Sequence, residues 1–276
     1  MVDSINTNAG ALNGLRQLQA TRESGATTRS QISSGRDVNS AEDNAAIFSI
    51  AQRERAEISG LNASQQSLDR ALSTSDVALA ASSQVGDLLG QLRERAVAAA
   101  DPGLDQTSRE ALNREFTQLR DQIGTTLENA GFNGTNPLVS GGGDIAAITD
   151  ANGENQLTIP EQDLSLGGGN IPLAQDSSIA TAADAQAAVG ALDTGIENLN
   201  TVSAELGAGA NRLEQSRTFN TLRSDTTEVG VGNLVDSNLA EDAANLAANQ
   251  VREELGIQAQ NIANRQPATL LQLFNG

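Results

Sequence analysis

The chain has 276 residues, of which 38% are hydrophobic and only 2% aromatic, and its formal net charge is −18. A surface this acidic argues against binding nucleic acid or an anionic membrane, because both need clustered cations. The sequence contains no histidine, cysteine or lysine, which excludes Ser-His-Asp and Cys-His nucleophiles, zinc cages and P-loops, so we predict no enzyme, no cofactor and no metal site.

The first predicted element is an amphipathic helix over residues 4–33. Ile5, Leu12 and Leu15 share one stripe and Leu18 lies close to it, but the apolar face fades towards Arg22. Residues 33–46 follow as a connector, in which small residues and a glycine end the first helix and acidic residues cap the next one. From composition alone, a plain loop is an equally good interpretation of this connector.

Two long periodic segments and a shorter one predict a helical rod. Apolar residues recur every three or four positions from about residue 44 to Ala100, which corresponds to a helix of roughly 80 Å. Asp101-Pro102-Gly103 ends this helix, and a capping box at Thr107 and Glu110 predicts the start of a second helix that folds back. A third periodic run begins near Thr181, and its four glycines require partner helices to hold it.

The segment between these helices, residues 137–180, has a different character. Residues 145–149 and 156–159 flank Asp150-Ala151-Asn152-Gly153 and predict a small β-hairpin, while residues 164–166 alternate like a strand. The oxygen donors of this turn faintly resemble a calcium loop, but the distant bidentate glutamate is absent and an ordinary turn is favoured.

The last segment, from about Asn238, has apolar residues at three- and four-residue steps and carries Leu270, Leu271, Leu273 and Phe274 near its end. Terminal segments are usually polar, because nothing there offsets the entropy of ordering, so these side chains need a cover. The expected fold is mainly α: an elongated antiparallel helical rod or coiled coil with paired terminal helices, a small β-hairpin region and no large outer domain.

Several blocks make the chain resemble bacterial flagellin, most closely the short flagellins of alphaproteobacteria. These blocks are SINTNAGAL at 4–12, ISSGRDVNSAEDNAAIFSIAQ at 32–52, FNGTNPL at 132–138, VGNLVDSNLAEDAANL at 231–246 and QNIANRQPATLLQLF at 260–274. The resemblance implies a self-assembling structural subunit of an extracellular flagellar filament used in motility. It also implies unfolded export through the flagellar type III apparatus with a chaperone, and cap and junction proteins as partners.

The resemblance further implies a division into three parts. Residues 1–43 with 237–276 would form inner-tube helices, residues 44–136 with 181–236 the surrounding rod layer, and residues 137–180 a small β-insert. The subunit-interface residues would be Ile5, Leu12, Leu15, Leu18, Val251, Leu255, Ile262, Leu270, Leu271, Leu273 and Phe274. The spoke between the layers would contain Ser34, Gly35, Arg36, Asn39 and Asp43.

A last implication concerns the vertebrate flagellin receptor. The arginine and leucine with which the family contacts this receptor align with Gln91 and Arg95, and only Glu115 matches the contacting acid. An altered hot spot of this kind predicts weak receptor activation.

Two alternatives stay open beside a filament subunit. One is a hook-filament junction protein or a minor flagellin. The other is a signalling or scaffold coiled coil, which uses the same residue types but does not explain the apolar C-terminal segment.

Overall fold

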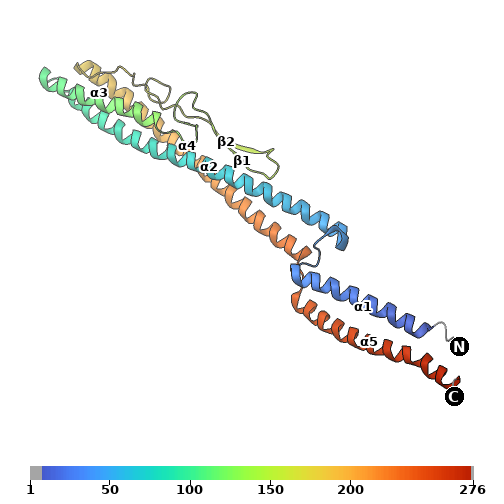
Figure 1. Ribbon diagram of the computed structural model, residues 1–276. Helices are drawn as coiled ribbons and strands as arrows, with labels where there is room; N and C mark the ends of the chain where they lie inside the picture. Colours follow the sequence, from blue (N-terminus) through green and yellow to red (C-terminus); the bar gives the residue numbers. More distant parts are fainter. Residues whose placement is uncertain (1–7, 275–276) are drawn as a thin grey trace. The chain divides into compact units, whose positions relative to one another are not determined.

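The computed structural model describes residues 8–274, and for residues 266–274 it describes the backbone only. The elements are α1 (Ala9–Ser34), α2 (Ala41–Ala99), α3 (Gln106–Glu128), β1 (Ile145–Ile148), β2 (Gln156–Ile159), α4 (Ala182–Val235) and α5 (Leu239–Phe274), labelled in Figure 1. The predicted fold class is confirmed: the chain is mainly helical, its terminal helices pair, and the described residues include one small hairpin and no outer domain.

The chain forms two compact units. One contains residues 1–56 with 227–276, and the other contains residues 57–226. In the first unit α1 packs along α5, and in the second α2, α3 and α4 run side by side with the hairpin against them (Figure 1). The division into inner-tube helices, rod layer and β-insert stays a prediction.

Three helix ends differ from the predicted ones for local reasons. α1 begins after Asn8, whose side chain accepts a hydrogen bond from the Ala11 N–H at 2.9 Å. α2 is interrupted at Asn44, whose φ of −159° is not helical and whose side chain caps the continuing helix through the Ala46 and Ile47 N–H groups. The capping box at Thr107 is wrong, because Asp105 accepts the capping bond from the Ser108 N–H at 3.0 Å.

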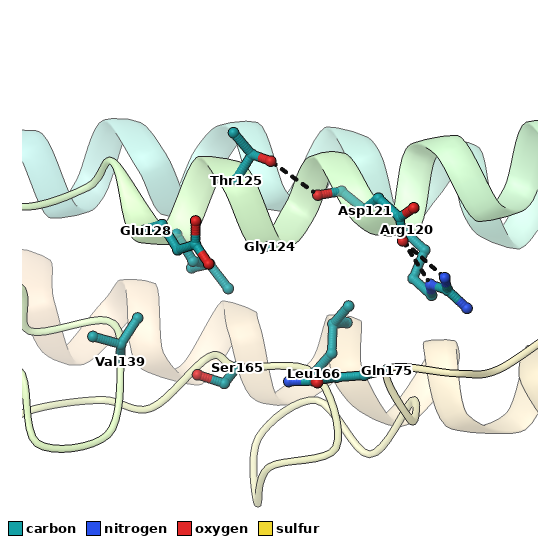
Figure 2. Close-up of a pocket in the computed structure, with 10 residues that line it drawn as sticks. Arg120, Asp121, Gly124, Thr125, Glu128, Val139, Ser165, Leu166 and Gln175 are labelled. Carbon is teal, nitrogen blue, oxygen red and sulfur yellow. Dashed lines mark hydrogen bonds and ion pairs between the residues drawn. The ribbon is translucent and has the colours of Figure 1, made fainter.

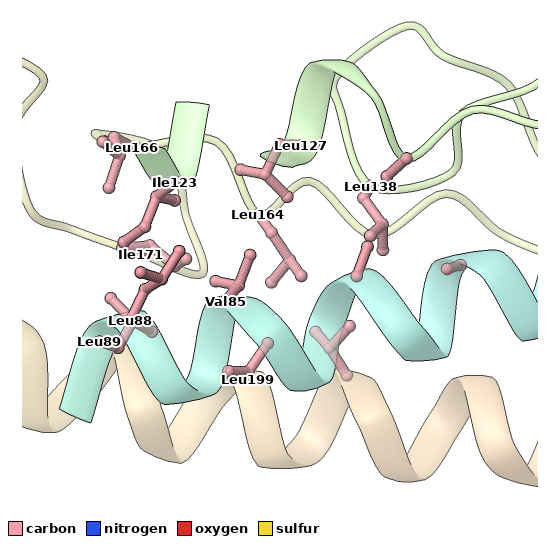
Figure 3. Packing of buried hydrophobic residues seen from close by; sticks show 14 of the residues in the cluster. Val85, Leu88, Leu89, Ile123, Leu127, Leu138, Leu164, Leu166, Ile171 and Leu199 are labelled. Atoms are coloured by element: carbon pink, nitrogen blue, oxygen red, sulfur yellow. The ribbon is translucent and has the colours of Figure 1, made fainter. Parts of the chain in front are cut away.

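The core of the second unit lies where α2 and α3 meet the segments after α3. Figure 3 shows Val85, Leu88 and Leu89 of α2 packing against Ile123 and Leu127 of α3 and against buried leucine and isoleucine side chains of residues 138–171. Alanines fill much of the remaining α2–α4 contact, so the helices can pack closely. A chain with few aromatic residues can therefore still bury a continuous apolar core.

Residues 164–166 do not form the predicted strand. Leu164 and Leu166 are both buried, as the alternation indicated, but Leu164 donates only one hydrogen bond to Leu138 O at 2.9 Å. Leu166 forms a single isolated bridge with Ile171. A strand needs a partner over several residues, and the described chain supplies none here.

The predicted hairpin is confirmed in position, with β1 ending one residue earlier than predicted, at Ile148. Ile145 pairs with Ile159 and Ile148 with Gln156 in an antiparallel ladder, and Gly153 takes a positive φ of 77° in the turn. A buried polar network attaches the hairpin to two helices. Asn220 of α4 donates to Ser64 Oγ of α2 and to Thr149 O, both at 3.0 Å, and the Ser64 hydroxyl donates to Ile148 O at 2.8 Å.

Candidate assembly surface

The antiparallel pair of α1 and α5 is held by polar side chains spread along its length. Asn8 Nδ2 donates to Ala263 O at 2.7 Å, Arg22 pairs with Glu253 at 2.7 Å, and Asn249 Nδ2 donates to Ser24 Oγ at 3.1 Å. Three contacts that join the two ends of the sequence define one register for the pair. The fading of the apolar face at Arg22 therefore marks an ion pair within the chain.

Small residues make up the seam between these two helices. Leu18 is 7% exposed. Its Cδ1 packs against Gly256, where an added Cβ would lie only 3.2 Å from it. Ala11, Thr21, Gly25 and Thr28 supply the rest of the buried seam on α1. The seam on α1 therefore contains one large apolar side chain, that of Leu18, whereas Leu12 and Leu15 of the same helix are exposed.

The predicted interface residues fall into three groups. Leu12, Leu15, Val251, Leu255 and Ile262 are exposed, with Ile262 at 66%. Leu18 is buried inside the chain's own helix pair. Ile5 lies outside the described residues, as do the side chains of Leu270, Leu271, Leu273 and Phe274.

Sequence reasoning missed two exposed apolar residues of α5, Leu239 and Ile257. Leu239 is the first residue of α5, ahead of the periodic positions that we followed. Ile257 follows Leu255 by two positions and therefore falls off the single stripe that the periodicity defined. Both add to the apolar surface of α5, so this surface is wider than one stripe.

Of the predicted spoke residues, Gly35, Arg36 and Asn39 lie in a connector, residues 35–40, that pairs with the link between α4 and α5, whereas Ser34 ends α1 and Asp43 lies in the first turn of α2. Gly35 takes a positive φ of 69° and ends α1 through a hydrogen bond to Gln31 O at 2.8 Å. The Asp37 N–H donates to Val235 O at 2.8 Å, and Gly35 O accepts from the Ser237 N–H at 3.1 Å. These two hydrogen bonds together form a single antiparallel bridge between Arg36 and Asp236.

Asp43 fastens the far end of the connector. Its carboxylate accepts from the N–H groups of Ser40 and Asn39, at 2.9 and 3.0 Å, and from the Ser40 hydroxyl at 3.1 Å. These hydrogen bonds, the one from the Ser40 N–H most strongly, hold the pKa of Asp43 below its usual value. Ser34 stabilises the near end, where its hydroxyl donates to Ser30 O at 2.8 Å. The connector is therefore an ordered, internally bonded segment.

The three residues of the predicted receptor face lie on α2 and α3 of the second unit. Arg95 Nε and Glu115 Oε2 form an ion pair at 2.8 Å across the two helices, and Gln91 is exposed one turn before Arg95. The structure thus brings an arginine and its acidic partner together on this face. Arg95, the position at which the resemblance implies a leucine, is thus paired with an acidic residue of α3.

One cavity of the second unit is lined by side chains of α3 and of the segment that follows it. It has a volume of about 340 Å³ and lies between α3 and residues 139–175, beside Gly124 (Figure 2). Arg120 is paired with Asp121 at 2.8 Å and donates to Ser177 O at 2.8 Å. Within the described residues no group of acidic side chains could hold a metal ion, and no helix is long and apolar enough to cross a membrane.

Known proteins resemble this chain over nearly its full length. The bacterial flagellin N-terminal helical region matches residues 5–141 and the C-terminal helical region matches residues 189–274. Flagellin FljM of Caulobacter vibrioides is 38% identical over 273 residues, which cover 99% of each chain, and Flagellin C of Rhizobium meliloti is 28% identical over 98% of this chain and 99% of its own. The crystal structure of Bacillus cereus flagellin superimposes with a TM-score of 0.50 at 26% identity, covering 56% of this chain and 88% of that one.

These matches confirm the expected resemblance to alphaproteobacterial flagellins and leave no reason to favour a signalling coiled coil. Paired terminal helices, a helical second unit and a small hairpin are the architecture that the resemblance implied. The chain therefore belongs to the bacterial flagellin family, whose members are structural, non-enzymatic subunits of the extracellular flagellar filament.

Proposed function

We propose that this flagellin polymerises through its paired terminal helices, which bury their outward apolar side chains against neighbouring copies. The observation that carries the proposal is the exposed apolar surface of the pair, formed by Leu12, Leu15, Val251, Leu255 and Ile262. Contiguous exposed apolar surface marks an interaction site. Contacts between two different patches that repeat without closing a ring generate an open helical polymer.

The size of the effect follows from the exposed fractions. Each of the five side chains is roughly half exposed, so complete burial contributes on the order of 1 kcal/mol per side chain, or about 5 kcal/mol for the set. One such contact alone corresponds to a weak affinity, in the range of about 0.1 to 1 mM. Repetition along a filament, where each copy contacts several others, turns this into a stable polymer.

Polymerisation of a variant with Leu255→Ser and Ile262→Ser tests the proposal. Both side chains are exposed in the single chain, so helix content should match the unchanged protein while the critical concentration for filament growth rises at least about tenfold. Gln258→Ala, an exposed polar change on the same helix, serves as the control and should leave the critical concentration unchanged. Equal critical concentrations for the double variant and the control would contradict the proposal.

Deletion of residues 268–276 examines the apolar C-terminal segment in the same way. We expect the shortened chain to stay monomeric and to keep the thermal transition of the second unit, because residues 57–226 form that unit without it. Sedimentation of the purified protein after addition of filament seeds measures the outcome. Normal filaments from the shortened chain would show that Leu270, Leu271, Leu273 and Phe274 are not needed for assembly.

We further propose the partners that the family implies: the flagellar export apparatus, a chaperone, and the cap and junction proteins. Family membership and the N-terminal match, which begins at residue 5, support this assignment. Secretion of the chain by cells with and without a working export apparatus provides the test. Accumulation in the medium of cells that lack the apparatus would exclude it.

A further inference from the structure

Asparagine followed by glycine occurs at three places in the described part of the chain, and the backbone differs at each of them. These pairs are Asn13-Gly14 in α1, Asn133-Gly134 in a tight turn, and Asn152-Gly153 in the loop of the hairpin. All three asparagine side chains are exposed to solvent. Access of water therefore does not distinguish the pairs, and a difference in their reactivity must come from the backbone.

The reaction open to this dipeptide is closure of a five-membered imide. The glycine N–H gives up its proton to base, and the nitrogen attacks Cγ of the asparagine. The bond from Cγ to the side-chain nitrogen breaks, and this nitrogen takes up a proton and leaves as ammonia. Water then opens the imide at either carbonyl, which yields aspartate or isoaspartate. Glycine favours the attack because it has no Cβ to obstruct it, but the asparagine must also rotate about its Cα–C bond.

Two of the pairs lack this rotation. Gly14 lies inside α1, where its N–H belongs to the helical hydrogen-bond ladder and the backbone angles are fixed. Asn133 and Gly134 occupy the two central positions of a type I′ turn, with φ of 51° and 83°. The Phe132 N–H donates to Thr135 O at 2.9 Å, and the Thr135 N–H donates back to Phe132 O at 3.0 Å. Rotation of Asn133 would therefore break this turn.

The third pair lies in a loop that is fastened only at its base. Asp150 accepts hydrogen bonds from the backbone and side-chain N–H groups of Asn155, at 3.1 and 3.2 Å, and the Thr149 N–H donates to Asn155 O at 3.0 Å. Above this base, neither Asn152 nor Gly153 makes a hydrogen bond within the described structure. A Cβ on Gly153 would have no neighbour within 4 Å. The loop thus leaves both the glycine nitrogen and the asparagine side chain free to react.

We propose that Asn152 is a site of spontaneous covalent modification, where the hairpin loop passes through the imide to aspartate or isoaspartate while Asn13 and Asn133 stay intact. The reaction consumes water and releases ammonia. It needs no second copy of the chain, so it proceeds in the single subunit and does not depend on polymerisation.

The place of the loop gives this modification a structural consequence. Ala151 directly precedes Asn152, and its carbonyl oxygen packs so closely on Gly60 of α2 that an added Cβ would clash with it. Isoaspartate lengthens the main chain by one carbon next to this contact, and either product places a new carboxylate two positions before Glu154. The modified loop therefore fits α2 less well, and the modified fraction records how long a subunit has existed.

Peptide mapping of the full chain, aged as the monomer in mildly alkaline buffer, tests the proposal. An endoproteinase that cleaves before aspartate places the three sites on different peptides, residues 3–36, 121–143 and 150–162. Isoaspartate leaves the last peptide whole and raises its mass by the difference between water and ammonia, whereas aspartate adds a cleavage before position 152. We expect position 152 to convert at least about tenfold faster than positions 13 and 133, where backbone hydrogen bonds must first break.

Ageing in concentrated urea separates the effect of the fold from that of the neighbouring residues. Without folded structure, the three positions should convert at similar rates. In the native chain, Asn152→Gln should remove most of the methyl groups accepted from protein L-isoaspartyl methyltransferase, because the longer side chain closes its ring far more slowly. Asn13→Gln, an exposed change of the same kind, is the matched control and should leave methyl acceptance unchanged.

Three results would overturn the inference and leave the proposed function untouched. These are an intact Asn152 after ageing, equal rates at positions 133 and 152 in the native chain, and a preference for position 152 that persists unchanged in urea.

Discussion

Replacing Asn220 with alanine tests whether the buried polar network holds the hairpin on the helical unit. The change removes two hydrogen bonds of 3.0 Å, to Ser64 Oγ and to Thr149 O. Each contributes a net 0.5–1.5 kcal/mol or so, and a buried carbonyl left without a donor adds a further penalty of about 1 kcal/mol or more. We expect a loss of about 3 kcal/mol in the free energy of unfolding, which for a unit of this size lowers Tm by about 6–12 °C.

Far-ultraviolet circular dichroism is the appropriate assay, because the chain contains no tryptophan or tyrosine for fluorescence. Thr221→Ala is the control on the same helix. Its hydroxyl is exposed and makes only a long contact of 3.3 Å with Gln65 Nε2 and a bond to its own helix, so its effect should stay within about 0.5 kcal/mol.

A double-mutant cycle with Ser64→Ala separates the shared bond from the others. Each single variant loses the Asn220–Ser64 bond, which the double variant loses only once. The double variant should therefore lose less stability than the two single variants together, by about 0.5–1.5 kcal/mol. The reasoning is refuted if Asn220→Ala unfolds within 0.5 kcal/mol or so of the unchanged protein.

Three further predictions follow from single features of the second unit. Gly60→Ala places a methyl group against the Ala151 carbonyl oxygen and should lower the free energy of unfolding, measured by chemical denaturation, by about 1–3 kcal/mol. Gly90→Ala on the same helix, where an added Cβ has no neighbour within 4 Å, should leave this free energy unchanged or raise it. Hydrogen bonds from the Ser108 hydroxyl and N–H lower the pKa of Asp105, so the ionised carboxylate stabilises the folded state above the ordinary carboxyl pKa, and this stabilisation is lost as pH falls through the lowered pKa. Asp105→Asn should therefore reduce Tm at neutral pH but not in strong acid. A difference in Tm that stays constant with pH would count against this. Gln91→Arg with Arg95→Leu should raise signalling of the monomer in a flagellin-receptor reporter assay at least about tenfold, since it restores two hot-spot side chains; no gain would contradict the alignment of this face.

The elements with strong local signals could be predicted from sequence. The asparagine-glycine turn placed both strands of the hairpin, because Gly153 supplies the positive φ that such a turn needs. Apolar periodicity located the long helices, because residues three or four positions apart lie on the same face of a helix. It placed the start of the long helix at about residue 44, where Asn44 caps the continuous part of α2, but it did not show the short helical turn that precedes Asn44 from Ala41.

Tertiary contacts decided the remaining features. Leu164 and Leu166 alternate correctly, but no neighbouring strand exists to complete a ladder. Leu18 and Leu255 look alike in the periodic pattern, yet Leu18 is buried opposite a glycine while Leu255 is exposed. The burial of Asn220 could not be predicted for a related reason: its hydrogen bond to Thr149 O depends on a hairpin far away in the sequence.

The pairing of α1 with α5 also sets the order in which the chain can fold. Arg22 and Glu253 are separated by 231 positions, and Asn8 and Ala263 by 255. At about 5–20 residues per second of synthesis, roughly 10 to 50 seconds pass between the appearance of the two partners, and closing so long a loop adds an entropic cost that shorter contacts do not have. During that interval α1 has no partner to fold against. The second unit, residues 57–226, does not need α5 and can form before synthesis ends, whereas α1 can pack only after the last helix has been made.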